Sequence, residues 1–263
     1  MQQLKDEGYR SIYLTDDNFL LKRKRITEIC NGIIKRGFNF HWGCEGRVDS
    51  AAIDQLPLMS MANCKFMAFG IEAGSQKVLD RLNKKQTLEQ IGYAVSEAKR
   101  NGIERVHGFF LVGSPGETKS EIMESFHFAA LLELDTFSFN RLCVYRGTPL
   151  WQEYIDRGII DDDRDWHKWF KCSDIDPTIL PSEVINRARM KGIAWLFFHR
   201  IFRRPVQTFR LLRTFKRYMK ISDIWKLLSS SFHRRTLSRQ PELPAKMIDF
   251  GIKEPDRNIV SLT

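Results

Sequence analysis

Two carboxylates stand where buried strands are expected to end. In "FMAFGIEAGS" an apolar run stops at Glu72 before a turn that contains glycine and serine, and in "FNFHWGCEGRVD" a second apolar run stops at Glu45. A carboxylate at the end of a buried strand needs a hydrogen-bond donor or a cation to offset its lost hydration. The sequence therefore predicts that at least one of Glu45 and Glu72 meets a ligand.

The turn after Glu45 and two further turns carry polar or flexible residues. Asp16 and Asp17 follow "RSIYLT", Arg47 and Asp49 follow Glu45, and "GSPGET" begins at Gly113. Each has a purely structural alternative. Asp16 or Asp17 can cap the next turn, and Ser75 can cap the helix after Glu72. Arg47 can pair with Asp49 within its own turn. In "GSPGET", a sharp turn leads to a helix start whose N–H groups can meet an anion or a carboxylate.

Strand-like and helix-like segments alternate up to about residue 158. The expected strands are "RSIYLT" (10–15), "FNFHWGC" (38–44), "CKFMAFGI" (64–71), "RVHGFFLVG" (105–113) and "DTFSFNRLCVY" (135–145). Amphipathic segments separate them, two of which open with the capping-box patterns Thr87-x-x-Gln90 and Thr118-x-x-Glu121. Repeated strand–helix units predict an α/β fold with a parallel sheet, open or closed, whose ligand site lies at the carboxyl ends of the strands.

The composition indicates a globular protein whose basic charge is concentrated near its C-terminus. The chain has 263 residues, 43% hydrophobic, with a net charge of +10. From Pro181 onward, 18 Lys and Arg face 6 Asp and Glu, a net +12, whereas residues 1–180 carry a net −2. Long uncharged apolar runs and a hydrophobic signal core are absent from the sequence, which indicates a cytoplasmic protein. Five cysteines include no CxxC-type pair, so no self-contained metal site is expected.

In this order, the turns resemble the second part of the radical S-adenosylmethionine (SAM) enzyme barrel. The matching pieces are "YLTDDNF", "EGRVD", "GIEAGSQKVLDRLNKKQT", "FFLVGSPGET" and "RLCVYRGTPLW". They look most like the branch that carries a cobalamin-binding domain before the barrel. The resemblance implies an α/β, partial (βα) TIM-like barrel of radical SAM type. The barrel would occupy residues 1–160 and would lack its first βα unit at the N-terminal end. A helical basic extension (161–240) and a loosely ordered tail (241–263) would follow it.

The same resemblance implies cofactors and site residues. Family members hold a 4Fe-4S cluster on CxxxCxxC, bind SAM at its open iron and generate a 5′-deoxyadenosyl radical. Glu45 and Glu72 match polar contacts to the methionine or ribose part of SAM, and Lys84 matches a basic position that can meet its carboxylate. The cofactor-binding residues expected are Glu45, Glu72, Lys84, Asp16, Arg47, Ser75 and Gly113, while the catalytic residues stay unknown. Cobalamin would belong to a full-length form.

The sequence departs from the family pattern in two places. It has no CxxxCxxC, since Cys30 and Cys44 lie 14 residues apart and after the expected cluster loop, and Phe109 replaces an acidic ribose contact of some relatives. The first strand, its cluster loop and any cobalamin domain are missing from the match. We therefore expect the C-terminal part of a radical SAM enzyme acting on a small molecule, active only together with the missing N-terminal part. By itself the chain should not cleave SAM.

An alternative of another class is a non-catalytic binding or scaffold protein that acts through its basic tail. "IFRRPVQTFRLLRTFKRYMKISDIWKLL" mixes cationic and apolar residues at helical spacing. Such a segment suits a membrane surface, an anionic polymer or a partner subunit, or a helix packed on the barrel with its arginines in solvent. Nothing in the tail resembles the RNA-binding module of related methylthiotransferases, which argues against an RNA partner.

Overall fold

The structure, a computed structural model, describes residues 1–159, 180–203 and 205 and the backbone of residues 259–262. Its strands are β1 (Ser11–Leu14), β2 (His41–Arg47), β3 (Cys64–Glu72), β4 (Arg105–Val112), β5 (Thr136–Arg141) and β6 (Ile259–Leu262). Its helices are α1 (Gln2–Asp6), α2 (Arg23–Lys35), α3 (Leu56–Met61), α4 (Gln76–Arg81), α5 (Leu88–Arg100), α6 (Lys119–Leu131), α7 (Pro149–Asp156) and α9 (Ser182–Arg203). Short 3₁₀ turns cover Phe19–Leu21 and Ile53–Gln55.

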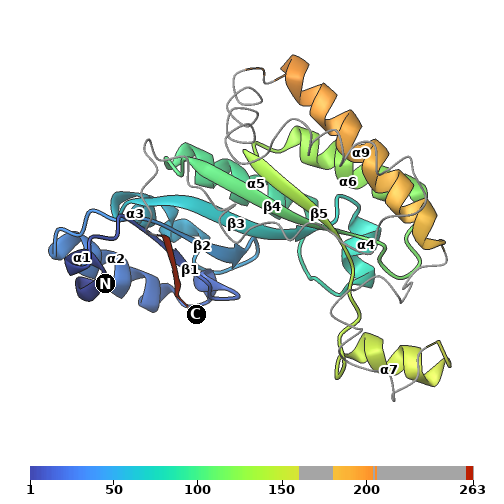
Figure 1. Cartoon of the computed structure of the whole chain (residues 1–263), viewed down its shortest axis with the longest axis horizontal. Helices are drawn as coiled ribbons and strands as arrows, with labels where there is room; N and C mark the ends of the chain where they lie inside the picture. The colour runs from blue at the N-terminus through green and yellow to red at the C-terminus, as the bar shows by residue number, and fades with distance from the viewer. Residues whose placement is uncertain (160–179, 204, 206–258, 263) are drawn as a thin grey trace.

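The strands form one parallel sheet in the order β5-β4-β3-β2-β1-β6 (Figure 1). The five strands expected from the sequence are all present, and the predicted α/β class is confirmed. Both capping boxes are formed, at Thr87 with Gln90 and at Thr118 with Glu121, so α5 and α6 begin where their sequences indicate. Strand–helix alternation thus builds consecutive parallel units, as right-handed crossovers require.

The sequence did not predict strand β6. Its four residues pair in parallel with β1, Ser11 opposite Ile259 and Leu14 opposite Leu262, so β6 forms the outer strand of the sheet beside β1 (Figure 1). β6 lies within the segment expected to be loosely ordered. Residues 160–179, 204, 206–258 and 263 lie outside the described residues, so the proposed boundaries at residues 160 and 240 stay predictions.

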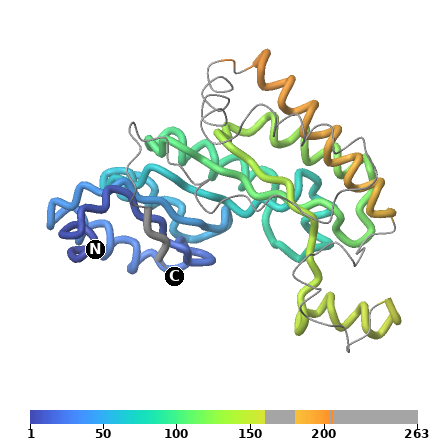
Figure 2. Tube along the Cα trace, in the orientation of Figure 1, coloured from blue at the N-terminus to red at the C-terminus, as the bar shows by residue number. Residues whose placement is uncertain are grey.

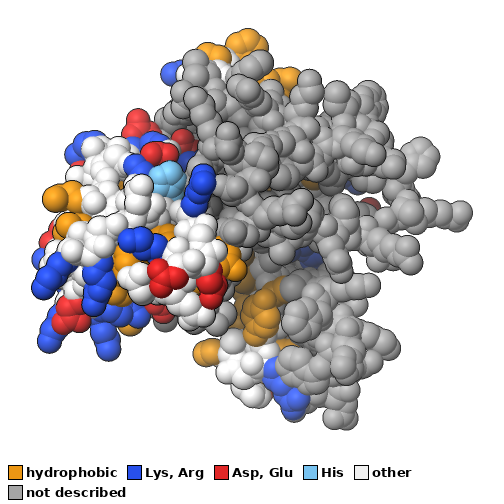
Figure 3. All heavy atoms as spheres, turned by 60° about the vertical axis from the view of Figure 1, so that its left-hand side comes forward, with side chains coloured by type: hydrophobic (Ala, Val, Ile, Leu, Met, Phe, Trp, Pro, Cys, Tyr) orange, Lys and Arg blue, Asp and Glu red, His pale blue; other side chains and the backbone are white. Residues whose placement is uncertain are grey.

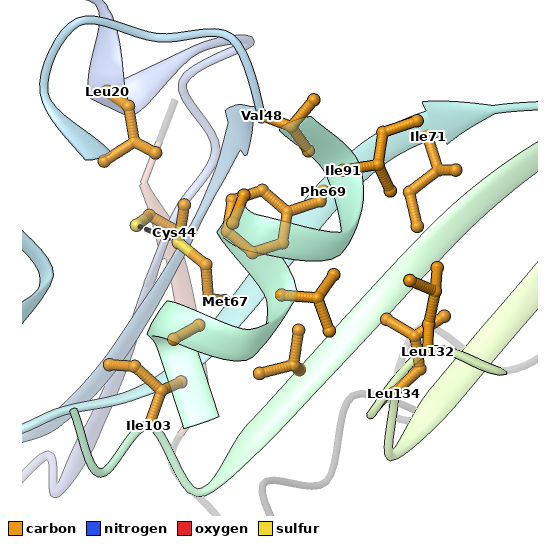
Figure 4. Packing of buried hydrophobic residues seen from close by; sticks show 14 of the residues in the cluster. Leu20, Cys44, Val48, Met67, Phe69, Ile71, Ile91, Ile103, Leu132 and Leu134 are labelled. Atoms are coloured by element: carbon orange, nitrogen blue, oxygen red, sulfur yellow. Dashed lines mark hydrogen bonds between the residues drawn. The ribbon is translucent and has the colours of Figure 1, made fainter. Parts of the chain in front are cut away.

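One apolar core joins the sheet to the helices on one of its faces. Alternate strand residues such as Met67, Phe69 and Ile71 pack with Ile91 of α5, as Figure 4 shows, and each of these four side chains is fully buried. Helix α9 lies along α6, where Gly192 leaves room for the Phe126 ring; a Cβ at Gly192 would lie 2.1 Å from that ring. The core therefore holds the sheet in place, and with it the carboxyl ends of the strands.

The opposite face of the sheet is polar and only partly covered. We call it the polar face; its side chains include Tyr13, Glu45, Arg47, Phe66, His107, Phe109, Thr136 and Ser138. All of them except Tyr13 keep an intermediate solvent exposure, including those on the central strands β2, β3 and β4.

Two observations complete the description of the fold. Helix α7 stands away from the sheet, on the chain that leaves β5 (Figure 2), and forms a small cluster of its own from Val144, Trp151 and Tyr154. On the face that brings the N-terminal elements forward, Lys and Arg side chains are interspersed with Asp and Glu (Figure 3). Among the described helices, none is both long and apolar enough to cross a bilayer.

Candidate functional site

Glu72 ends β3 in an unusual backbone conformation. Its φ is +69°, and the pairing between β3 and β4 shifts register between Gly70 and Glu72. A non-glycine residue in this region costs about 1 kcal/mol, and such strain tends to be retained where function needs a side chain in one place. The conformation places the Glu72 carboxylate 2.5 Å from Lys84 Nζ, with the two side chains 13% and 29% exposed.

The loop that carries Lys84 is fixed on both sides. Asn83 and Lys85 both have positive φ, at +52° and +50°, so the backbone turns sharply on either side of Lys84. The Lys84 carbonyl accepts a hydrogen bond of 2.8 Å from Arg47 Nη2, and the buried Gln86 donates from Nε2 to the Ile71 carbonyl at 2.8 Å. The lysine is thus held against the end of β3 by contacts from two strands.

Arg47 pairs with Asp49, the structural alternative that the sequence left open. Its Nε and Nη2 donate to the two Asp49 oxygens at 2.9 and 2.8 Å. The hydrogen bond to Asp49 is the main cause of the raised pKa of Arg47. Because the same Nη2 reaches the Lys84 carbonyl, Arg47 also ties the end of β2 to the Lys84 loop. We interpret Arg47 as a positioning residue for Lys84.

Glu45 lies deeper on the polar face. It is opposite Ala68, four residues before Glu72 on β3, so the backbone positions of the two residues are separated by roughly 13 Å along the strand direction. Tyr13 Oη donates to Glu45 Oε1 at 2.7 Å, and burial, followed by this bond, raises the pKa of Tyr13. The sequence missed Tyr13, because its pairing with Glu45 depends on the register of β1 against β2.

The remaining expected site residues take mainly structural positions. Asp16 forms an ion pair of 3.0 Å with Arg25, which lies in the first turn of α2. Ser75 is the buried N-cap residue of α4, and its side chain makes no capping hydrogen bond. The Gly113 N–H donates to Glu117 Oε2 at 2.6 Å. The free N–H groups expected in "GSPGET" are therefore met by a carboxylate of the same turn.

Glu117 is a buried residue that sequence reasoning did not single out. It is 2% exposed, and its Oε2 accepts from Gly113 and Ser114 at 2.6 and 2.9 Å. Within the part of the chain that the structure describes, neither Glu117 Oε1 nor the Ser114 hydroxyl has a hydrogen-bond partner. Burial raises the pKa of Glu117 to about 7 in spite of the two backbone donors. The feature of the sequence that could have indicated this contact is the position of Glu117, four residues after Gly113 in the same turn.

The described residues do not fit an iron–sulfur cluster. Cys30, Cys44 and Cys64 are free thiols buried in the helix-side core, and burial raises the pKa of Cys30 to about 12 and that of Cys44 well above its usual value. Cluster ligands are thiolates, so these residues are unsuited to the role. Within the described ranges, no group of three His, Cys, Asp or Glu side chains is placed to hold a metal ion.

Comparison with known proteins places this arrangement in a family. Residues 1–129 match the model of the Radical SAM superfamily. An uncharacterized methyltransferase of Pyrococcus horikoshii is 31% identical over 189 residues, which cover 70% of this chain and 40% of the relative. The anaerobic magnesium-protoporphyrin IX monomethyl ester cyclase of Rubrivivax gelatinosus is 32% identical over 146 residues, 55% of this chain and 26% of the relative. The chain belongs to the radical SAM superfamily.

Solved structures confirm the TIM-like radical SAM fold. The cobalamin-dependent radical enzyme OxsB, with aqua-cobalamin and SAM bound, matches with a TM-score of 0.58 at 15% identity, over 88% of this chain and 44% of that one. The radical SAM methyltransferase TsrM from Kitasatospora setae, with cobalamin and a [4Fe-4S] cluster bound, matches with a TM-score of 0.54 at 19% identity, over 60% and 32% of the two chains. The chain thus spans less than half the length of these relatives, and they include the cobalamin-dependent branch.

Proposed function

We propose that this chain forms the SAM-binding part of a radical SAM enzyme, and that thiolates from polypeptide outside this sequence hold the cluster. The observation that carries the proposal is the preformed Glu72–Lys84 ion pair at the carboxyl end of β3, braced by Arg47. The matching family model and the methyltransferase and cyclase relatives support the same chemistry. Methyl transfer and cyclisation are both open as its reaction, as is the need for cobalamin.

The ion pair suits the charge pattern of SAM. The methionine part carries an ammonium and a carboxylate, and the ribose carries two hydroxyl donors. Lys84 Nζ would bind the carboxylate, while the Glu72 oxygens would accept from the ammonium or from a ribose hydroxyl. When SAM binds, the ion pair between Glu72 and Lys84 is replaced by contacts of each residue with an oppositely charged or hydrogen-bonding group of SAM. Neither charge is therefore left unpaired in the partly buried site. When bound beside a reduced cluster, SAM supplies the radical chemistry of the family.

The other expected residues have supporting positions. Arg47 and Gln86 hold the Lys84 loop, and Gly113 and Glu117 shape the turn after β4. Glu45, with Tyr13, would be reached only by a group that extends down the polar face. The alternative of docking through the basic tail stays a prediction. Of its basic residues, Arg203 is described and exposed, whereas Arg204, Arg210, Arg213, Lys216 and Arg217 lie outside the described residues.

The proposal is tested by titrating SAM into the full chain and into the variants Glu72→Gln and Lys84→Met, with bound SAM measured by equilibrium dialysis. Each variant should bind SAM more weakly by about 1 to 3 kcal/mol, roughly 5- to 150-fold, because a charge-assisted hydrogen bond is lost.

Lys99→Met is the matched control. Lys99 forms an ion pair of 2.8 Å with Asp135, and the two side chains are 22% and 21% exposed. This pair lies at the amino ends of the strands, whereas Glu72 and Lys84 lie at the carboxyl ends. The SAM affinity of the Lys99→Met variant should equal that of the unmodified chain. If folded Glu72→Gln and Lys84→Met variants bind SAM as tightly as the control does, the proposed site is wrong.

A further inference from the structure

Helix α9, which lies along α6 (Figure 1), presents three aromatic rings to solvent. Its buried residues include Gly192 and Leu196, whereas Trp195, Phe198 and Phe202 are 36%, 61% and 83% exposed. Because residues three or four apart share one side of a helix, the three rings form a continuous strip. We call these three residues the aromatic stripe.

The ring of Trp195 is held between two imidazoles. His127 of α6 meets it edge to face, with ring centroids 4.5 Å apart, and His199 stacks on it at 5.0 Å. Leu131, one turn after His127 on the same side of α6, is 76% exposed. Apolar surface therefore extends from α9 onto α6. Large apolar side chains that gather on the outside of a protein often mark an interaction site.

Cations flank the aromatic stripe at both ends. Arg187 and Lys191 are exposed one and two turns into the same side of α9, before the rings, and Arg203 is exposed directly after them. The sequence that follows is more basic still, since residues 204–222 contain six Lys and Arg and no Asp or Glu. The surface thus combines apolar rings with an excess of positive charge at its C-terminal end.

The area and charge of this surface favour a lipid bilayer over a protein partner. At roughly 200 Å² per aromatic side chain, the three rings expose about 350 Å², less than half of the area that one partner of a stable protein complex buries. A second copy of the chain would bring the same cations together, and exposed acids such as Glu133 and Glu183 are too few to offset them. Aromatic rings beside cations are typical of helices that lie in the surface of an anionic bilayer.

We propose that the aromatic stripe of α9 docks the protein on a membrane surface that carries anionic phospholipids. Trp195, Phe198 and Phe202 would enter the region between the headgroups and the acyl chains, with α9 parallel to the membrane plane. Lys191 and Arg203 would meet lipid phosphates, because their long side chains can reach the headgroups while the rings stay below. This inference does not rest on the proposed SAM site, which lies at the carboxyl end of β3.

Co-sedimentation of the full chain with vesicles tests the proposal. The chain should bind vesicles of two parts phosphatidylcholine to one part phosphatidylglycerol, and should bind pure phosphatidylcholine at least about tenfold more weakly. Binding to the anionic vesicles should weaken as salt rises. Phe198→Ser and Phe202→Ser should each weaken it about five- to tenfold, because a large apolar side chain no longer enters the membrane. Arg203→Gln should weaken it about fivefold.

Fluorescence quenching locates the contact on α9. Bromine atoms on the acyl chains quench only those tryptophans that come close to them. The chain has six tryptophans, so the difference in emission between the unmodified chain and the variant Trp195→Phe isolates the signal of Trp195. That signal should be quenched on anionic vesicles with brominated chains. An unquenched Trp195 signal on vesicles that bind the chain would contradict the proposed contact.

Tyr93→Ser and Lys24→Gln are matched controls, since Tyr93 is a ring 55% exposed on α5 and the Lys24 side chain is 90% exposed on α2. Both should bind vesicles like the unmodified chain. Absence of binding, or folded Phe198→Ser and Phe202→Ser variants that bind like the controls, would overturn the inference. So would a dimer in solution that is lost in Phe202→Ser, because the occupant would then be a second copy. Each of these outcomes leaves the test of SAM binding unaffected.

Discussion

Replacement of Gly74 by alanine should destabilise the protein by about 3 kcal/mol, because the new methyl group has no space. A Cβ at Gly74 would lie 2.5 Å from Phe128 Cβ, 2.7 Å from Ser125 Cα and 2.9 Å from the Glu124 carbonyl oxygen. Two of these atoms belong to the α6 backbone, which cannot move without disturbing the core. The shift would also disturb the 2.8 Å hydrogen bond from the Gly74 N–H to Ser125 Oγ.

Urea unfolding of Gly74→Ala and Gly92→Ala measures this effect against a matched control. Gly92 lies inside α5, and a Cβ there meets nothing within 4 Å. Gly92→Ala should therefore stabilise the chain by about 0.5 to 1 kcal/mol, since alanine favours helix more than glycine does. If Gly74→Ala proves as stable as the unmodified chain, the turn after β3 is flexible rather than packed, and Glu72 is not held in place by it.

Glu117 should make the stability of the chain fall as pH rises from about 4.5 to about 7. Burial raises the pKa of Glu117 from 4.5 to about 7 in the folded state, so in this interval the folded chain keeps a proton that the unfolded chain has lost. The stabilisation is complete below pH 4.5 and is lost as pH rises through the folded-state pKa. At about 1.4 kcal/mol per pKa unit, the difference amounts to about 3 kcal/mol.

The variant Glu117→Gln isolates this contribution. Its amide oxygen can still accept from the Gly113 and Ser114 N–H groups, but it does not titrate. The free energy of unfolding of the unmodified chain, minus that of the variant, should decrease by about 3 kcal/mol between pH 4.5 and 8. A difference that stays constant with pH would show that the carboxyl group is ionised in the folded chain throughout.

The sequence predicted the fold well because its signals are local. Capping boxes at Thr87 and Thr118 and apolar strand runs each specify their own element, and parallel packing follows from their alternation. Strand β6 escaped prediction because its pairing joins Ser11 to Ile259, and a contact between such distant residues leaves no periodic pattern.

The site was predicted in part. Because carboxyl ends of strands converge, the sequence indicated that Glu72 and Lys84 approach one region, and the structure brings them into contact. The sequence indicated that a carboxylate at the end of a buried strand needs a donor or a cation, and Lys84 of the same chain is that cation for Glu72. The sequence assigned both Glu45 and Glu72 to contacts with SAM, but the register of β2 against β3 places Glu45 four positions before Glu72, where it accepts a hydrogen bond from Tyr13. Such contacts depend on strand register and on buried turns, which neighbouring residues do not encode.

Pairing of Lys84 with the carboxylate of SAM is the central claim, and one binding cycle tests it most directly. SAM and decarboxylated SAM are titrated into the unmodified chain and into Lys84→Met. The four affinities give the coupling free energy between the Lys84 ammonium and the carboxylate of SAM. The account predicts a coupling of about 1 to 3 kcal/mol, with Lys84→Met discriminating poorly between the two ligands. A coupling near zero, with both ligands weakened equally or not at all by Lys84→Met, would contradict it.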